Sequence, residues 1–178
     1  MPVGSRLRIY TIHRICDSAF RDCVSMRRLV VENDRVKIGE RAFENCASLE
    51  SIQLPDGMTE IYGGVFNSCK SLRSICLPQH LTILGESAFS DCEGLEEIVV
   101  PENVTKIDDL TFNGCTGLKS VTLNNGLRKI GKSAFKNCRM LTRIEIPESV
   151  AFIDNAPFRG CESMKSIQVA PRNKYFKS

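Results

Sequence analysis

The sequence is poor in the residues that usually build an active site. It has no tryptophan, only two histidines and only three tyrosines among its 178 residues. It also lacks a glycine-rich phosphate-binding motif and an acidic cluster with the spacing of a calcium loop. These absences argue against catalysis, and we expect a protein that is not an enzyme and that needs no cofactor and no metal.

Long apolar runs are missing as well. No stretch approaches the roughly 20 apolar residues that a membrane-spanning helix requires. Residues 1–10 contain arginines but not the apolar core of about 7 to 15 residues found in secretory signals. The sequence therefore predicts no membrane span and shows no export signal, while 42% apolar and 25% charged residues are typical of one ordinary globular domain.

What the sequence does contain is an internal repeat of 23 residues that runs without insertion or deletion from Ile15 to Val169. Two columns of the repeat are invariant, and they consist of Phe20, Phe43, Phe66, Phe89, Phe112, Phe135 and Phe158 and of Cys23, Cys46, Cys69, Cys92, Cys115, Cys138 and Cys161. Further columns hold leucine, isoleucine, valine or methionine. Such a unit cannot bury its apolar face alone, so consecutive repeats must stack on one another.

One repeat, residues 84–107, indicates the local structure. Its segment 88–95 places apolar residues every three or four positions, which is typical of one or two helical turns. Ile98 and Val100 then alternate with outward residues, as in a short strand, and Pro101 ends that strand.

We therefore predict an α/β solenoid of seven repeats. Short parallel strands would cover one face, and short helical turns would cover the other. A single domain would span residues 1–178, with regular repeats over about 12–169. The C-terminal string VAPRNKYFKS looks like the continuation of such repeats into a longer segment, and our interpretation is that the chain is a fragment of a longer array.

The consensus I-x-x-x-A-F-x-x-C-x-x-L-x-x-I-x-[LVI]-P-x-x-V-x-x-I resembles the BspA-like leucine-rich repeats over nearly the whole chain. The resemblance implies secreted or surface proteins of host-associated bacteria and parasites, which use such arrays to adhere to host or matrix proteins. It supplies no catalytic residue.

Nine cysteines raise the question of a disulfide framework or a metal site. The chain contains no C-x-x-C pair for zinc, and four apolar columns provide a core without disulfides. We therefore expect the column cysteines to be buried free thiols. Cys76 alternates with inward residues, so it is expected to face outward and to be the most reactive thiol, and a nucleophilic pair with His80 is a remote alternative.

Function in a solenoid usually lies in the outward residues of its sheet. The predicted partner-binding residues are Arg28, Val30, Gln53, Ser74, Cys76, Glu97, Val99, Thr122, Arg143 and Glu145. These positions contain no aromatic anchor of the kind that dominates tight interfaces, so a merely solvated sheet face is the competing interpretation.

Charge is uneven along the chain, although the net charge is only +3. Residues 1–37 hold eight basic and four acidic residues, residues 38–118 hold four and thirteen, and residues 119–178 hold twelve and four. The basic residues of the last segment include Arg128, Lys129, Lys132, Lys136, Arg139 and Arg143. This segment could attract an acidic partner, a sulfated glycan or the acidic middle of another copy, whereas nucleic acid is not expected because no aromatic platform accompanies the charge.

The sequence thus predicts a non-enzymatic protein-protein interaction module. The leading hypothesis is adhesion or ligand binding to a host or extracellular matrix protein, with the chain secreted or at the cell surface by family resemblance. The alternative is an intracellular, cytoplasmic scaffold, which would suit the many free thiols and the missing signal.

Overall fold

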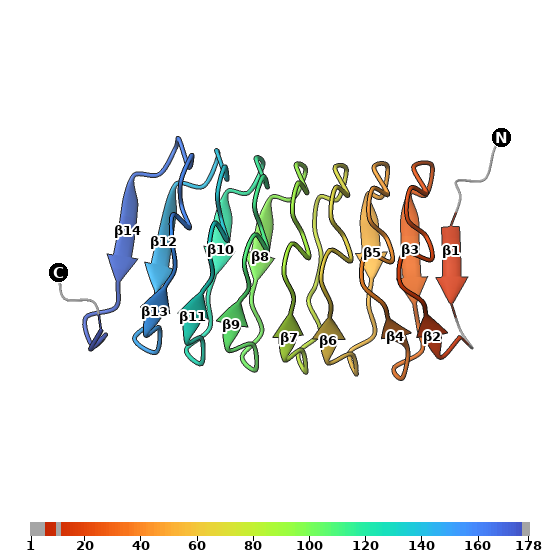
Figure 1. Cartoon of the computed structure of the whole chain (residues 1–178), viewed down its shortest axis with the longest axis horizontal. Helices are drawn as coiled ribbons and strands as arrows, with labels where there is room; N and C mark the ends of the chain where they lie inside the picture. The colour runs from red at the N-terminus through yellow and green to blue at the C-terminus, as the bar shows by residue number, and fades with distance from the viewer. Residues whose placement is uncertain (1–5, 10–11, 176–178) are drawn as a thin grey trace.

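The computed structural model describes residues 6–9 and 12–175, and for residues 6–9 it describes the backbone only. Stacked turns form a straight array, with its first and last strands at opposite ends (Figure 1). Adjacent turns are related by the 23-residue repeat, and both of the strand ladders described below are parallel. The described residues contain no helix that could cross a membrane.

The first ladder contains the strands that the sequence predicted, and we call it the long ladder. Its strands are β1 (Arg6–Ile9), β3 (Arg28–Val31), β5 (Ser51–Gln53), β8 (Glu97–Val99), β10 (Ser120–Thr122), β12 (Arg143–Ile146) and β14 (Ser166–Val169). Paired residues are 23 apart from β3 onward, as in Leu29 with Ile52. Between β5 and β8 the ladder is reduced to a single bridge, from Ser51 to Ser74, and no backbone pairing joins β10 to β12 in the described part of the chain.

A second ladder, the short ladder, was not predicted. It contains the two-residue strands β2 (Arg14–Ile15), β4 (Lys37–Ile38), β6 (Glu60–Ile61), β7 (Ile83–Leu84), β9 (Lys106–Ile107), β11 (Lys129–Ile130) and β13 (Phe152–Ile153). One isoleucine or leucine of each strand points into the core, and the preceding residue points outward. Most turns of the solenoid therefore contribute one strand to each of two ladders, and the turn at Ser74 contributes only a bridge to the long ladder.

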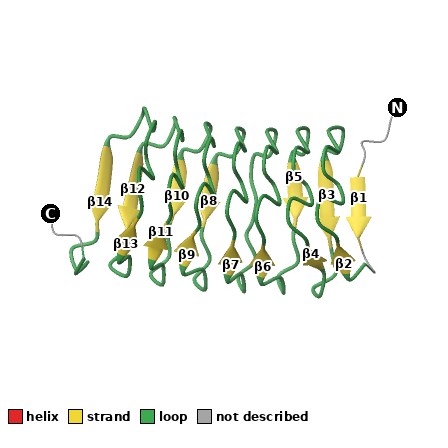
Figure 2. Ribbon diagram, in the orientation of Figure 1, coloured by secondary structure: helices red, strands yellow, loops and turns green. Residues whose placement is uncertain are grey.

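The predicted helical turns are wrong, because the described residues contain strands and loops but no helix (Figure 2). The segment that was expected to be helical contains two residues with positive φ in every repeat, four positions apart, for example Ser87 (φ 54°) and Asp91 (φ 56°). A left-handed residue cannot continue a right-handed helix. The α/β description is thus replaced by a solenoid of strands and tight turns.

Hydrogen bonds show how this turn segment is held. The Ala88 amide donates within its own turn to the Gly85 carbonyl at 3.2 Å, whereas the Ser87 amide donates to the Asp109 carbonyl of the next turn at 3.0 Å. The same alternation recurs along the segment, so every second amide joins neighbouring repeats. The spacing of three to four residues reflects this run of turns rather than a helix.

The core consists of the columns that the sequence identified. Phe43, Phe66, Phe89, Phe112 and Phe135 are fully buried. Adjacent rings of the phenylalanine column stack with centroids 5.3 to 5.8 Å apart. Offset stacking at this separation is favourable beyond the area that the rings bury.

The cysteine column lies beside the phenylalanines, and its thiols are free, as predicted. From Cys46 onward, each thiol donates a hydrogen bond to the phenylalanine carbonyl of the preceding repeat, with Sγ to O distances of 3.1 to 3.3 Å. Burial raises the pKa of the Cys46 thiol to about 12. These side chains therefore act as small apolar groups with one useful donor.

Candidate functional site

The outward side chains of the long ladder, which we call the sheet face, are the candidate site. Gln53, Cys76, Thr122, Arg143 and Glu145 are all exposed. So are Arg28, Ser74, Glu97 and Val99, and Val99 is 62% exposed. Nine of the ten predicted residues therefore face solvent.

Val30 is the exception, because it is only 6% exposed and belongs to the buried residues. It lies in a three-stranded part of the ladder, paired with Arg8 of β1 and with Gln53 of β5. Val99, at the corresponding position of β8, has the same side chain but remains open. We therefore remove Val30 from the candidate site.

The sheet face is hollowed over β10, β12 and β14. We call this depression, of about 650 Å³, the C-terminal hollow. It is lined by Lys119, Ser120, Val121, Thr122, Leu123, Asn125, Arg143, Ile144, Glu145, Pro147, Glu148, Gln168 and Ala170. Its volume falls within the range of ligand sites, and charged and polar side chains dominate its lining.

The C-terminal hollow brings together three of the predicted residues, Thr122, Arg143 and Glu145. Two others, Ser74 and Glu97, line a smaller hollow of about 350 Å³ farther along the sheet face. The remaining predicted residues line neither hollow. The candidate site is therefore concentrated near the C-terminal end of the long ladder.

The sequence analysis missed Lys119 and Glu148 as lining residues. Lys119 directly precedes β10, and Glu148 follows β12. Both are exposed charged residues next to the outward columns. Their charge was a usable signal, but only the curvature of the chain at each strand end shows that they border the hollow.

A column of alternating charge runs along the edge of the sheet face, one residue before the strands. It consists of Arg27, Glu50, Arg73, Glu96 and Lys119. The Arg27 Nη1 to Glu50 Oε1 and Lys119 Nζ to Glu96 Oε2 distances are both 2.7 Å. The hydrogen bond from Lys119, its positive charge and that of Arg73 lower the pKa of the Glu96 carboxyl. Lys119 is thus paired within the array.

Arg143 differs from Lys119, since no ion pair joins it to any residue in the described part of the chain. Its paired position on β14 is Ser166, and the residue one turn earlier is Ser120. Glu145 also lacks an ion pair among the described residues, and it pairs with Gln168. Two opposite charges therefore stand free within the C-terminal hollow.

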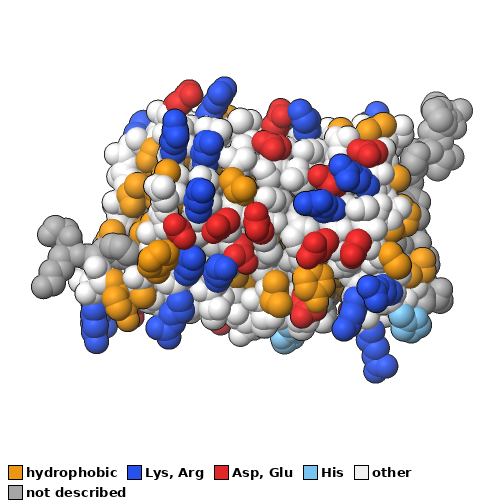
Figure 3. All heavy atoms as spheres, in the orientation of Figure 1, with side chains coloured by type: hydrophobic (Ala, Val, Ile, Leu, Met, Phe, Trp, Pro, Cys, Tyr) orange, Lys and Arg blue, Asp and Glu red, His pale blue; other side chains and the backbone are white. Residues whose placement is uncertain are grey.

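The basic residues of the C-terminal third do not form one patch. Figure 3 shows basic side chains toward the β14 end of one face and acidic ones near its middle. Lys129 belongs to the short ladder, where its Nζ lies 5.0 Å from the Phe152 ring centroid and 3.3 Å from Asp154. Arg143 belongs to the long ladder, and Arg139 pairs with Glu162 at 3.6 Å. An acidic partner would meet these charges on different sides of the array.

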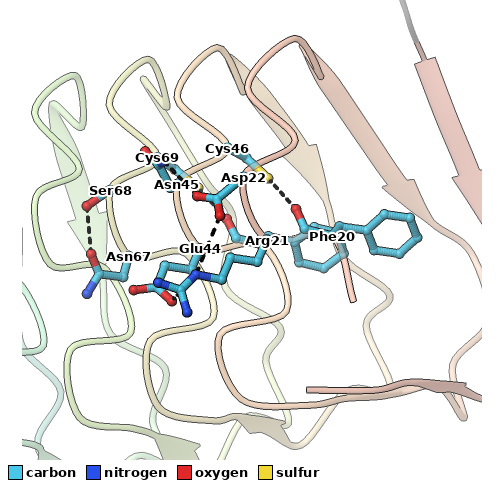
Figure 4. A network of polar contacts seen from close by, with 10 residues as sticks. Phe20, Arg21, Asp22, Glu44, Asn45, Cys46, Asn67, Ser68 and Cys69 are labelled. Atoms are coloured by element: carbon cyan, nitrogen blue, oxygen red, sulfur yellow. Dashed lines mark hydrogen bonds and ion pairs between the residues drawn. The ribbon is translucent and has the colours of Figure 1, made fainter. Parts of the chain in front are cut away.

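Polar side chains on the turn segments join neighbouring repeats (Figure 4). The Asn45 side-chain amide donates to Asp22 at 2.8 Å, and the Arg21 Nε lies 3.2 Å from a Glu44 carboxylate oxygen. Each contact joins residues 23 positions apart, so the network stabilises stacking. Within the ranges that the structure describes, no group of three or more His, Cys, Asp or Glu side chains could hold a metal ion.

The alternative of a Cys76 nucleophile gains no support from the geometry. Cys76 and His80 are both exposed, and no hydrogen bond joins them in the described part of the chain. Neither lines a hollow described above. The thiol is accessible, as predicted, but it lacks the cleft and the orienting partner that a catalytic nucleophile requires.

The array is similar to solved bacterial proteins. It shares 29% sequence identity and a TM-score of 0.83 with the T. pallidum leucine-rich repeat protein, over 92% of this chain and 79% of that protein. With a leucine-rich cell surface protein of Faecalibacterium prausnitzii it shares 30% identity and a TM-score of 0.81, over 92% of this chain and 47% of that protein. The chain thus spans about half the length of the second relative.

None of the curated proteins matches the chain. The pneumococcal vaccine antigen PcpA, at 20% identity and a TM-score of 0.58, shares the fold. A family model described as a BspA type leucine-rich repeat region with six copies matches residues 8–118 and again residues 87–178. Those matches, together with the seven stacked turns, show that the chain belongs to the BspA-type leucine-rich repeat family.

Proposed function

We propose that the chain is a non-enzymatic protein-binding module and that its partner contacts the sheet face. The observation that carries this proposal is the C-terminal hollow, where Arg143 and Glu145 stand exposed without an ion pair. Exposed charges that form no ion pair within the array are available to a partner. Leucine-rich repeat proteins are typically binding modules, which supports the same conclusion.

We further propose that the partner is a host or extracellular matrix protein and that the binding serves adhesion. Support comes from family membership and from the F. prausnitzii relative, which is described as a cell surface protein. The sheet face extends across the stacked turns, so it can contact a macromolecule at several points.

The second candidate is an intracellular scaffold, which the free thiols favour. All nine cysteines are unpaired, and seven of them form the column beside the stacked phenylalanines, from Cys23 to Cys161. Reducing compartments keep thiols in this state. Protease treatment of intact source cells distinguishes the candidates, because a surface adhesin is cleaved while the cells remain whole and an intracellular scaffold is protected.

The sheet face is tested by binding of immobilised matrix and host-surface proteins to the purified chain. The test variant replaces Gln53, Val99, Thr122, Arg143 and Glu145 by alanine. The control variant replaces five exposed residues in or next to the short ladder, Lys37, Thr82, Ile83, Lys106 and Phe152, by alanine. Thermal unfolding of both variants confirms that each is folded.

We expect the sheet-face variant to lose binding and the short-ladder variant to retain it. Equal binding by the two variants would contradict a role for the sheet face. Loss of binding only in the short-ladder variant would show that the binding site lies on the short ladder.

A further inference from the structure

The C-terminal hollow follows the strands and the turns after them. Its lining runs from Lys119 to Asn125 in one turn and from Arg143 to Glu148 in the next. β12 spans Arg143–Ile146, which is about 10 Å at about 3.3 Å per residue, and Pro147 and Glu148 lie beyond its end. In the described part of the chain no backbone pairing joins β10 to β12, whereas β12 pairs with β14. Because the outward side chains of a strand recur every two residues, a hollow along β12 suits an extended peptide, whose side chains have the same period.

The hollow also carries a charge pair that occurs in no other turn of the sheet face. Arg143 and Glu145 are two residues apart on β12, so their side chains leave the same side of the strand, roughly 7 Å apart. In the outward columns, Arg28 is followed two residues later by Val30 and Glu97 by Val99. The strand β1 has two basic residues, Arg6 and Arg8, at the corresponding register positions, and no other turn combines an acidic with a basic residue.

The residues that flank this pair on the adjacent turns are uncharged. Ser166 pairs with Arg143, and Gln168 pairs with Glu145. One turn earlier, Ser120 and Thr122 occupy the corresponding positions and also line the hollow. The hydroxyl and amide groups can bond to a peptide backbone, while the two charges remain unneutralised by the array.

We propose that the C-terminal hollow binds an extended segment of the protein partner in which an acidic and a basic residue are two positions apart. The inference rests on the proposed function and names the sequence feature that the partner carries. Side chains at i and i+2 of an extended peptide share one face and match the Arg143 to Glu145 spacing. The acidic residue contacts the Arg143 guanidinium, which can bind a carboxylate through two hydrogen bonds. The basic residue contacts Glu145.

The same charges disfavour a purely anionic ligand in this hollow. Glu145 and Glu148 line it together with Arg143, and Lys119 is already paired with Glu96. A sulfated glycan would therefore bring its negative groups against two carboxylates. A zwitterionic peptide satisfies both signs at once.

The test uses fluorescence anisotropy with blocked, labelled octapeptides in a serine and threonine background, titrated with the full chain to millimolar concentration. One probe contains Glu-x-Lys, a second contains Lys-x-Glu, and a third contains adjacent Glu-Lys. We expect one of the i, i+2 probes to bind at least tenfold more tightly than the adjacent probe. Binding should weaken as salt is raised from 50 to 500 mM.

A charge-swap variant, R143E/E145R, makes the assignment specific. It exchanges the two charges without changing the net charge, and it should reverse the preference between the Glu-x-Lys and Lys-x-Glu probes. The matched control is R28E, which alters the same outward column outside the hollow. R28E should leave the preference unchanged.

Two results would overturn the inference: no preference for any i, i+2 probe over the adjacent probe, or an unchanged preference in the swapped variant. If either occurs while the five-alanine sheet-face variant still loses its protein partner, the peptide assignment is wrong and the proposed function stands. If the five-alanine sheet-face variant also still binds its protein partner, both the peptide assignment and the proposed function are wrong.

Discussion

Phe89 lies between the rings of Phe66 and Phe112, with centroids 5.4 and 5.7 Å away. It is fully buried, and its carbonyl accepts the hydrogen bond of the Cys115 thiol at 3.1 Å. One residue thus belongs to two columns of contacts, one through its ring and one through its backbone. A change at this position affects the packing of both neighbouring turns.

Replacing Phe89 by alanine should lower the free energy of unfolding by about 3 to 5 kcal/mol, because the ring leaves a cavity that the stacked neighbours cannot fill. Urea unfolding followed by circular dichroism measures the change. Phe152→Ala is the matched control, since Phe152 is 52% exposed and its removal should cost less than about 1 kcal/mol. Equal losses in the two variants would contradict the core role of the column.

The buried thiols should make the protein less stable at alkaline pH. Burial raises the pKa of the Cys46 thiol from an ordinary value of 9.0 to about 12, and it raises the pKa of Cys69 further. Below pH 9 the thiols are protonated in both states. Above it, the unfolded chain loses protons that the folded chain retains, and each such thiol lowers the free energy of unfolding by roughly 1.4 kcal/mol per pH unit.

Urea titrations under reducing conditions between pH 8 and 11 test this dependence. In Cys69→Ala the free energy of unfolding should fall less steeply with pH, by about the roughly 1.4 kcal/mol per pH unit that one thiol contributes. This change in slope is expected whatever the effect of the substitution on stability at pH 8. Cys76→Ala, which removes an exposed thiol, serves as the control. A decline of the same steepness in wild type and Cys69→Ala would show that the column does not titrate as argued.

At the scale of elements, most repeats combine two strands with one run of tight turns. The strands of the long ladder could be predicted from alternation of apolar and polar residues, because that period is two in any strand. The turn run could not be predicted from its spacing of three to four residues. Ser, Asp, Asn, Arg, Leu and Ala occupy left-handed positions in different repeats, so no single residue type marks them.

The turn at Asn124 lacks the proline that follows the strand at Pro55, Pro78, Pro101 and Pro147. The Asn124 side-chain amide donates to the Pro101 and Val104 carbonyls at 2.7 and 2.9 Å, and its oxygen accepts from the Gly126 amide at 2.7 Å. These bonds tie the turn to its neighbour. A sequence shows the loss of proline but not the partners that replace its restraint.

The left-handed positions predict that one substitution lowers the free energy of unfolding and another raises it. Gly114→Ala should lower the free energy of unfolding by about 1 kcal/mol or more, because φ is 74° and the new Cβ would collide with the Asp91 carboxylate. Ala156→Gly should raise it by up to about 1 kcal/mol, because φ at this exposed position is 52°. Thermal and urea unfolding measure both variants. A loss of stability in Ala156→Gly would contradict the argument.

At the scale of the whole molecule, each turn packs only on its neighbours, so the end turns have less support than the middle ones. Phe20 and Phe158 are partly exposed, whereas the five phenylalanines between them are fully buried. The array should therefore open from its ends.

Hydrogen exchange followed by mass spectrometry should show this gradient. Peptides that cover residues 84–107 should exchange most slowly, and those that cover residues 14–31 and 152–169 should exchange faster, because local opening costs less where one neighbour is missing. Uniform protection along the array would indicate a single cooperative unit instead. Since β12 and β14 carry the C-terminal hollow, a bound peptide should slow exchange in residues 143–169.

The sequence by itself determined the repeat, its register and the identity of the core columns, because a strict 23-residue period allows only one alignment of the turns. It also determined that nearly all the outward residues of the long ladder face solvent. Only the tertiary structure decided that the turn segment is not helical, that Val30 is covered and that a second ladder exists. The tertiary structure alone showed that Arg143 and Glu145 line a hollow and that Lys119 is paired with Glu96. Backbone φ values and contacts of this kind depend on the neighbouring turns rather than on spacing along the chain.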